Sequence, residues 1–304
     1  MRTLSAGAAV ALSLLLSTPP AWPVAVQPYR IGADDRIATD VIVNGRGPFT
    51  FLLDTAASRS MMFEHLRARL GLGPAGETLL TVYGMENIGT AVPVRTDELR
   101  VSDLAVRGLT MGVLPDESGT SDGLLGMDAL YGRLVVLDRP NLELKLLSPD
   151  SGEAADIREW PSLALTRRPV RNLPEGFWSM RASFRGVSVT SLLDMGSGMT
   201  ILNWKAAEAL GLKRTSFPKD GISQKLRDAL GTVEPVVLVK DVTIWLAGRV
   251  FRNQTVLIAN IKVFEYFGLA GEPAAIIGSG LLKDNSLAID FAGQRLYIGP
   301  AVKE

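Results

Sequence analysis

Hydrophobic positions in this chain fall mainly into short runs with the length and alternation typical of β-strands. Two pairs of these runs are joined by turn residues: 37–43 with 49–53 through Asn44-Gly45, and 177–184 with 187–193 through Arg185-Gly186. An Asn-Gly pair between two apolar runs is a strong signal for a tight hairpin. The pattern therefore predicts two β-hairpins, one in each half of the chain.

Helical spacing is confined to two short segments, near 62–71 and 203–212. Asn203 has the side chain expected of an N-cap at the start of the second segment. Segments rich in Val, Ile and Thr fill much of the remaining second half, as in 233–239, 242–247 and 250–258. The expected fold class is therefore all-β with a few short helices.

The two halves of the chain contain the same two sequence blocks in the same order. The first pair is 47–72 with 187–212, and the second is 122–138 with 274–290. The alignments place Asp54 on Asp194 and Gly126 on Gly278. Because the blocks stand further apart in the second half, that half holds an insertion between them. The repetition predicts an internal duplication, with two lobes related by a pseudo-two-fold axis.

The boundary between the lobes is expected near 148–172, where Ser, Pro, Gly and Arg concentrate and the periodicity fades. The expected division is a signal peptide at 1–25, an N-terminal lobe at 26–150, a linker at 151–172 and a C-terminal lobe at 173–304.

Residues 1–25 have the organisation of an export signal. Arg2 supplies a positive charge, an apolar run extends from Leu4 to Leu16, and Thr18-Pro19-Pro20 breaks it. The run is too short to span a bilayer comfortably, and no second apolar segment reaches that length. We therefore expect an exported protein, periplasmic or secreted, without a stable membrane span once the signal is removed.

The composition excludes several classes of function. Lys and Arg together number 32 and are balanced by 32 Asp and Glu, which gives no electrostatic reason to expect a nucleic-acid partner. The chain has no cysteine, so disulfides, Cys-ligated zinc and cysteine nucleophiles are excluded. Its single histidine, His65, cannot form a multi-histidine metal site, and no nucleophile elbow accompanies it. We expect neither metal nor cofactor, and we interpret His65 as a half-exposed helical residue.

In each half, an aspartate directly follows an apolar strand and small residues come next. The two sequences are Asp54-Thr55-Ala56-Ala57 and Asp194-Met195-Gly196-Ser197. Small residues suit a tight turn in which backbone N–H groups approach the carboxylate. A pseudo-two-fold axis would bring both aspartates together, and two adjacent carboxyls share one proton. One can then activate water while the other polarises a carbonyl, which predicts peptide hydrolysis without a covalent intermediate.

Gly47–Ser58, which contains Asp54, and the later Leu124-Leu125-Gly126 resemble the retropepsin-like and pepsin-like aspartic peptidases. The closest likeness is to the bacterial Gag-polyprotein-type aspartyl peptidases. Their signature is an apolar pair before Asp-Thr-Gly and a small residue, then a second apolar pair and a glycine that crosses beneath the active-site loop. Both elements occur in both halves, so the likeness covers nearly all of the chain after the signal.

The resemblance implies a bilobal acid-protease fold with Asp54 and Asp194 at the floor of a cleft between the lobes. Gly126 and Gly278 would lie in the crossing loops. Because both halves lie in one chain, a monomer can assemble the pair, and the expected partner is a peptide or protein substrate. The resemblance also implies a flap above the cleft, where Tyr83-Gly84 is similar to the Tyr-Gly of pepsin-like flaps. An ordinary strand aromatic is an equally good interpretation of Tyr83.

Three residues of the loops depart from the family pattern or from each other. Ala56 replaces a glycine but keeps the backbone N–H that would bond the carboxylate. Met195 replaces one of two threonines whose hydroxyls lock the loops together in the family, so only Thr55 can do so here. Ser197 aligns with Ala57, and its hydroxyl could bond Asp194. We therefore expect Asp194 to be the ionised partner and Asp54 to carry the proton.

Two alternatives to an active aspartic endopeptidase remain open. The same fold could bind a peptide or protein partner, with cleavage weakened by Ala56 and Met195. A glycosidase also uses paired carboxylates, although the duplicated Asp loops and the lack of a candidate Glu pair disfavour it. Asp128 aligns with Gly280 rather than with a second acid, so no paired catalytic role is expected for it.

Overall fold

The computed structural model describes residues 25–116, 121–170, 173–216, 224–227 and 233–302. The signal peptide expected at 1–25 lies outside the described residues except for Ala25. Most of the described chain is in strands, and the helices are short, so the prediction of a mainly β fold is confirmed. None of the helices within these ranges is long and apolar enough to cross a membrane.

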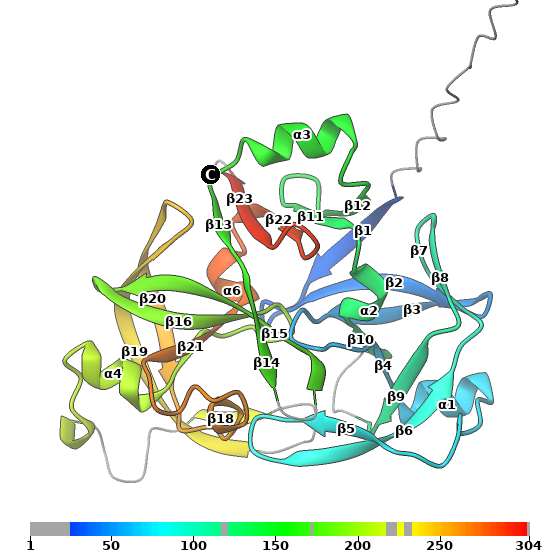
Figure 1. Cartoon of the computed structure of the whole chain (residues 1–304), viewed down its shortest axis with the longest axis horizontal. Helices are drawn as coiled ribbons and strands as arrows, with labels where there is room; N and C mark the ends of the chain where they lie inside the picture. Colours follow the sequence, from blue (N-terminus) through cyan, green and yellow to red (C-terminus); the bar gives the residue numbers. More distant parts are fainter. Residues whose placement is uncertain (1–24, 117–120, 171–172, 217–223, 228–232, 303–304) are drawn as a thin grey trace, which may run out of the picture.

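Strands from both halves of the chain form a shared antiparallel sheet, here called the base sheet. Its strands, in spatial order, are β13 (Ser162–Ala164), β23 (Arg295–Ala301), β22 (Asn285–Asp290), β11 (Leu134–Asp138), β12 (Glu143–Leu147) and β1 (Ala25–Ile31). The β11–β22 pair joins the two halves, with Val136 opposite Ala288. Helix α3 (Gly152–Arg158) covers one face and buries Ile157 against the sheet (Figure 1).

The N-terminal lobe is a strongly bent sheet continuous with β1. Its strands, in spatial order, are β2 (Ile37–Val43), β3 (Arg46–Leu53), β10 (Gly123–Leu125), β4 (Met61–Phe63), β9 (Thr110–Leu114), β6 (Ile88–Arg95) and β5 (Leu80–Tyr83). In addition, β7 (Glu98–Val101) pairs with β2, and β8 (Leu104–Arg107) pairs with β7. Its helices are α1 (Glu64–Leu70) and α2 (Met127–Leu130). Alternate residues of β2 are buried, as expected for a strand with one face on a core. The expected first hairpin is therefore present.

The C-terminal lobe is built on a second sheet. Its strands, in spatial order, are β14 (Thr166–Val170), β15 (Leu173–Phe184), β16 (Val187–Asp194), β21 (Ala274–Gly278), β17 (Ile201–Leu202), β20 (Arg249–Ile258), β19 (Val233–Leu246) and β18 (Gln224–Arg227). Its helices are α4 (Trp204–Ala209), the 3-10 turn Arg214–Ser216, α5 (Val263–Tyr266) and α6 (Ser279–Leu282). The side chain of Asn203 accepts the Ala206 N–H at 2.8 Å, so its predicted N-cap role is confirmed. The strands expected at 233–239 and 242–247 form one strand, β19, with irregular pairing between them.

The two lobes repeat one arrangement around their aspartate loops. In the N-terminal lobe, β10 lies parallel to β3 with Leu124 opposite Leu52. In the C-terminal lobe, β21 lies parallel to β16 with Ile276 opposite Leu192. The connection from β20 to β21 contains α5, and no helix is described in the shorter connection from β9 to β10. The segment expected as a linker, 151–172, contains α3, β13 and β14.

His65 lies between two carboxylates at the start of α1. Its Nδ1 is 2.8 Å from Asp116 Oδ1, and its Nε2 is 3.1 Å from Asp122 Oδ1. Asp122 also accepts the Thr50 N–H at 2.7 Å, so the contacts join α1 to the entrance of β10. Partial burial works against a charged ring, but hydrogen bonds and charges from Asp116 and Asp122 outweigh it and raise the pKa of His65.

Replacing His65 with Gln is expected to destabilise the protein mainly in mildly acidic solution. Because the folded state raises this pKa, the stabilisation is complete below the unfolded value of about 6.5 and disappears as pH rises through the folded value. The ring is partly exposed, so solvent screening limits the effect to about 0.5–1 kcal/mol. Denaturant unfolding at about pH 5.5 and about pH 8.5 measures it. The single histidine resonance in an NMR titration gives an independent check, and an unshifted midpoint contradicts the expectation.

Candidate active site

The loops after β3 and at the end of β16 hold their aspartates in matching ways. Asp54 Oδ1 accepts the N–H groups of Ala56 and Ala57, each at 2.9 Å. Asp194 Oδ1 accepts those of Gly196 at 2.9 Å and Ser197 at 3.2 Å. Each carboxylate thus has one oxygen fixed by a turn and the other available for chemistry.

The two loops meet, and this contact brings the aspartates together. A Cβ atom added to Gly196 would lie 2.7 Å from Asp54 Cγ, so the Asp54 carboxyl packs directly against the backbone of the opposite loop. Only glycine allows that approach. Ala56 has no such constraint, because its φ is not positive, and an L-residue occupies the position without strain. The expected effect of Ala56, a preserved N–H donor, is what the geometry shows.

Thr55 links the loops by a pair of buried hydrogen bonds, here called the Thr55 lock. Its hydroxyl donates to the Leu193 carbonyl at 3.0 Å and accepts the Met195 N–H at 3.0 Å. The reciprocal bonds are missing because Met195 has no hydroxyl. The Met195 side chain is fully buried and packs instead in the main hydrophobic core.

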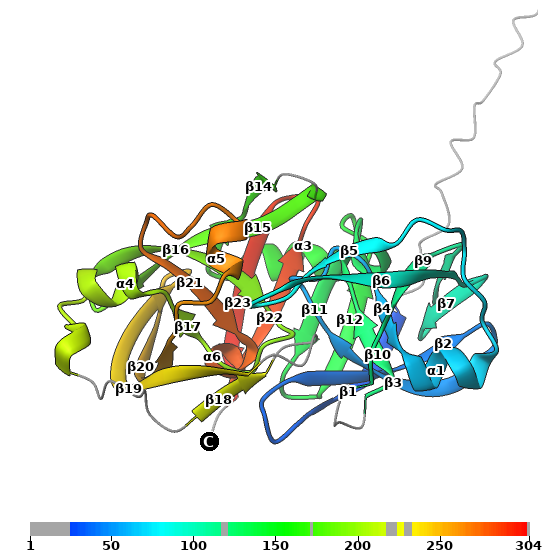
Figure 2. The same ribbon diagram turned by 90° about the horizontal axis from the view of Figure 1, so that it is seen from below.

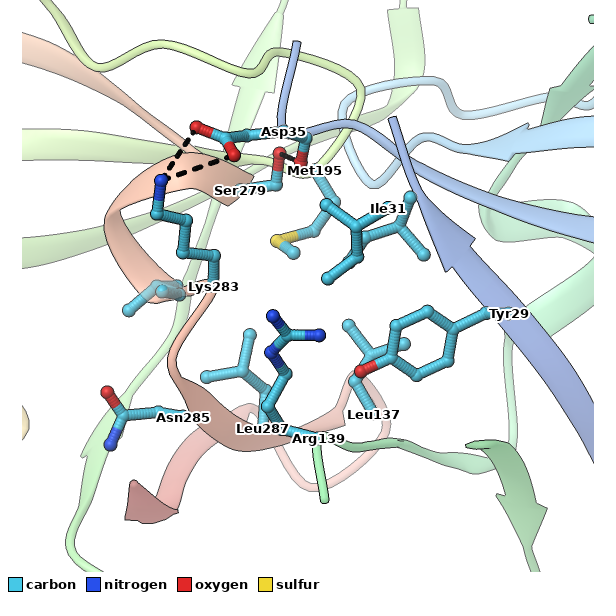
Figure 3. A pocket seen from close by; sticks show the side chains of 12 residues that line it. Tyr29, Ile31, Asp35, Leu137, Arg139, Met195, Ser279, Lys283, Asn285 and Leu287 are labelled. Atoms are coloured by element: carbon cyan, nitrogen blue, oxygen red, sulfur yellow. Dashed lines mark hydrogen bonds and ion pairs between the residues drawn. The ribbon is translucent and has the colours of Figure 1, made fainter. Parts of the chain in front are cut away.

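Behind Met195 is a small cavity of about 10 Å³, close to the volume that one water needs. Met195 lies beside Ile31 in Figure 3, with Leu137 and Tyr29 on the facing wall. The missing half of the lock is therefore replaced by apolar packing.

Gly126 and Gly278 lie where the second half of each block passes behind its loop. A Cβ on Gly126 would clash with the backbone of Arg59, and one on Gly278 would clash with the carbonyl oxygens of Ser197 and Met199. The crossing segments are also bonded to the loops: Leu125 O accepts the Asp54 N–H at 3.0 Å, and Ser197 O accepts the Ser279 N–H at 2.8 Å. Both glycines thus occupy the positions expected from the sequence, and both are needed for close packing.

Burial dominates the ionisation of the two aspartates. It raises the pKa of Asp54, against the opposing effect of the Ala57 and Ala56 N–H groups. It also raises the pKa of Asp194, and the negative charge of Asp54 adds to it, so that this pKa reaches about 7. Two close carboxyls cannot both ionise cheaply, and the pair holds one proton over a wide pH range. Burial thus favours the protonated form at both positions, and the pair shares one proton.

The hydrogen bond on which the expectation of an ionised Asp194 depends, from the Ser197 hydroxyl to the Asp194 carboxyl, is not formed. The Ser197 hydroxyl donates to the Met199 carbonyl at 2.9 Å and does not bond the Asp194 carboxyl. Only its backbone N–H supports Asp194, as the N–H of Ala57 supports Asp54. A serine hydroxyl can bond the backbone carbonyl two residues later and so close a local turn. That carbonyl then competes with the carboxylate for the one hydroxyl proton.

Sequence reasoning missed the segment 32–36, which joins β1 to β2 and reaches the C-terminal lobe. The carbonyl of Asp35 accepts the Ser279 hydroxyl at 2.7 Å, and its carboxylate is 3.3 Å from Lys283 Nζ. Arg36, held by Asp34 at 2.6 Å, is close enough for its charge to lower the pKa of both Asp54 and Asp194. The only sequence signal is the Asp-Asp-Arg turn itself, which has no counterpart in the second half.

The expected flap is a hairpin of β5 and β6 that extends to the C-terminal lobe (Figure 1, Figure 2). Gly84 closes its tip by donating to Asn87 O at 2.9 Å. Met85 O accepts the Val263 N–H at 2.9 Å, and the carbonyl of Glu86 accepts the Tyr266 hydroxyl at 3.0 Å.

The side chains at the flap tip make further contacts with α5 and the residues on either side of it. Glu86 Oε1 accepts the Lys262 N–H at 3.2 Å. The Tyr83 ring lies 5.8 Å from that of Tyr266 and 6.3 Å from that of Phe267. We call the contacts of 83–86 with 262–267 the flap latch. Tyr83 therefore packs on the inserted α5 region, a role that no sequence signal indicated.

The aspartyl protease family model matches residues 39–129, which include the Asp54 loop, the flap and the Gly126 crossing. This match supports an aspartic-peptidase relationship for the N-terminal lobe and ends before Asp194. No curated protein matches the chain at a significant level.

Proposed function

We propose that this protein is an aspartic endopeptidase whose catalytic pair is Asp54 and Asp194. The observation that carries the proposal is the packing of the Asp54 carboxyl against Gly196, in the loop that holds Asp194. The family match over residues 39–129 supports the chemistry of the first loop. The matching N–H bonds and crossing strands of the second loop support the same role for Asp194, and a duplication accounts for both.

The proposed reaction uses the single proton that the pair shares. Ionised Asp54 takes a proton from a water held between the carboxyls, and the water oxygen attacks the peptide carbonyl carbon. Protonated Asp194 gives its proton to the carbonyl oxygen, which forms a neutral tetrahedral diol. Asp54, now protonated, gives its proton to the amide nitrogen while ionised Asp194 takes a proton from one diol hydroxyl. The C–N bond then breaks, which releases an amine and a carboxylic acid and returns both aspartates to their starting states. Because Asp194 loses its proton as pH rises through about 7, activity is expected to fall over that range.

Export and monomeric assembly are part of the proposal. The N-terminal signal pattern supports a periplasmic or secreted protein. Both aspartate loops belong to one chain, so no second copy is required to complete the pair. An extended peptide, able to pair with strand edges such as those of the flap, is the proposed substrate.

The proposal is tested by incubating the purified protein with a diverse peptide mixture between about pH 3 and about pH 8, and identifying products by mass spectrometry. Asp54→Asn is the inactive variant, and Asp103→Asn, at the exposed turn between β7 and β8, is the matched control. Cleavage by the wild-type protein and Asp103→Asn, but not by Asp54→Asn, supports a peptidase. Peptide binding without cleavage at any pH overturns it and supports the peptide-binding alternative.

A further inference from the structure

The small cavity behind Met195 lies where the two halves of the chain meet. Its volume of about 10 Å³ admits one particle of about the size of a water molecule. Strand β1 contributes Tyr29 and Ile31 to the wall, and the end of β11 with the residue after it contributes Leu137 and Arg139. Helix α6 and the start of β22 line it from the C-terminal half. Figure 3 shows the Arg139 side chain reaching into this space.

Arg139 carries a charged donor that the described residues leave without an acceptor. Its main-chain N–H donates to the Ser286 hydroxyl at 3.1 Å, which fixes the start of the side chain. Its Nε is buried and has no hydrogen-bond partner within the part of the chain that the structure describes. Arginine does not lose its proton in proteins, so it cannot avoid the cost of burial by becoming neutral. The site therefore favours an acceptor beside Nε.

The charges around Arg139 leave it uncompensated. Asp35 and Lys283 are the other charged residues that line the cavity, and they lie 3.3 Å apart and pair with each other. Asp138, the neighbour of Arg139 in the chain, lies 3.0 Å from Lys145 Nζ and pairs with that residue. A water molecule can accept a hydrogen bond from Nε, but an anion also balances the charge.

Tyr29 supplies a second donor on the same wall. Its side chain is 3% exposed, and its hydroxyl points toward the Arg139 guanidinium in Figure 3. Burial raises the pKa of Tyr29 against the opposing charge of Arg139, so the hydroxyl keeps its proton and can donate it. Most of the remaining wall is apolar, formed by Ile31, Ile37, Leu137, Met195, Leu282 and Leu287. Such surroundings screen charge poorly and strengthen the attraction between a guanidinium and an anion.

We infer that this cavity binds one monatomic, monovalent anion, a halide such as chloride, between the Arg139 guanidinium and the Tyr29 hydroxyl. Its volume excludes sulfate, phosphate and organic carboxylates, which are much larger than a water molecule. The bound anion joins β1 to the end of β11 beside Met195, whose main-chain N–H belongs to the Thr55 lock. The inference does not depend on the proposed peptidase function.

Thermal unfolding of the purified protein in sodium chloride and in sodium gluconate, at equal ionic strength, tests the site. Gluconate is too large for the cavity and reproduces only the screening by salt. At chloride about tenfold above the dissociation constant, we expect the unfolding midpoint to lie about 2–4 °C above its value in gluconate. The shift should saturate, because one anion binds to the folded state. Crystals soaked in bromide should show an anomalous peak beside Arg139 Nε.

Two variants assign the shift to the cavity. Arg139→Gln removes the charge, and we expect it to lose the chloride shift. Tyr29→Phe keeps the ring and loses one donor, so half of the maximal shift should require at least about threefold more chloride. Arg107→Gln, on the exposed β8 hairpin, is the matched control for loss of one arginine and should keep the full shift.

The outcomes separate a built site from a general effect of salt. A saturating chloride shift that Arg139→Gln abolishes supports the site, and a bromide peak beside Arg139 supports it even where that variant does not fold. Equal midpoints in chloride and gluconate overturn the inference. A chloride shift of full size in Arg139→Gln also overturns it, as do bromide peaks found only elsewhere on the protein.

Discussion

Asp194→Asn is expected to abolish peptide cleavage and, at neutral pH, to stabilise the fold. Loss of the proton donor removes the group that polarises the peptide carbonyl, so kcat is expected to fall by roughly a thousandfold or more. The stabilisation arises because Asn removes a buried charge but keeps an oxygen for the Gly196 and Ser197 N–H groups. Opposite effects on activity and stability are typical of strained catalytic groups.

The pH dependence of that stabilisation follows from the pKa of Asp194. Folding raises this pKa from 3.8 to about 7, so the folded state binds a proton that the unfolded state releases in between. Wild-type stability therefore falls as pH rises from about 4 to about 7, and levels off above. The advantage of Asp194→Asn should be near zero at about pH 4 and on the order of 2–4 kcal/mol above pH 7.

Denaturant titrations at several pH values give the free energies of unfolding of the wild type and of Asp194→Asn, and hence the difference in stability between them. Asp103→Asn serves again as the control and should show no such trend. A variant that is less stable than the wild type at neutral pH, or an advantage that grows toward acid, contradicts the raised pKa.

Thr55→Val is expected to destabilise the protein by about 2–4 kcal/mol, because it leaves two buried backbone groups without partners. Valine matches the shape of threonine, so no cavity forms. The loss is confined to the bonds with Leu193 O and Met195 N–H. Because these bonds fix the separation of the loops, kcat should fall at least tenfold even where the variant remains folded.

Thr55→Ser is the matched variant that keeps the hydrogen-bonding hydroxyl. Serine keeps the hydroxyl and loses only a methyl group, so it should recover most of the stability and kcat lost in Thr55→Val. Both variants are compared by denaturant unfolding and by peptide cleavage at one pH. Equal losses in the two variants would show that packing, not the hydroxyl, holds the loops.

The parts of the fold that follow from local chemistry could be predicted from the sequence. The Asn44-Gly45 turn and the Asn203 cap depend on neighbouring residues, and the structure has both at the expected places. The positions of Asp54, Asp194, Gly126 and Gly278 follow instead from the repetition of the two blocks, which carry the same contacts in both halves.

Features that depend on a choice between nearby acceptors, or on distant partners, could not be read from the sequence. The hydroxyl of Ser197 has two acceptors within reach, and only the folded turn decides between Asp194 and Met199. His65 owes its charge environment to Asp116 and Asp122, more than fifty residues away. The effect of the Arg36 charge on the two aspartates depends on how the lobes pack, which no periodicity encodes.

The flap latch sets a threshold for anything that enters beneath it. Three hydrogen bonds to 262–266 must break together, at about 0.5–1.5 kcal/mol each, so the open form is a minor species, at most about a tenth of the molecules. Apparent affinity for a substrate is reduced by that fraction. A chain that has entered can leave only when the hairpin lifts again, so the flap latch would act on both entry and release. Residues of α5 would then influence access to the aspartates without touching them.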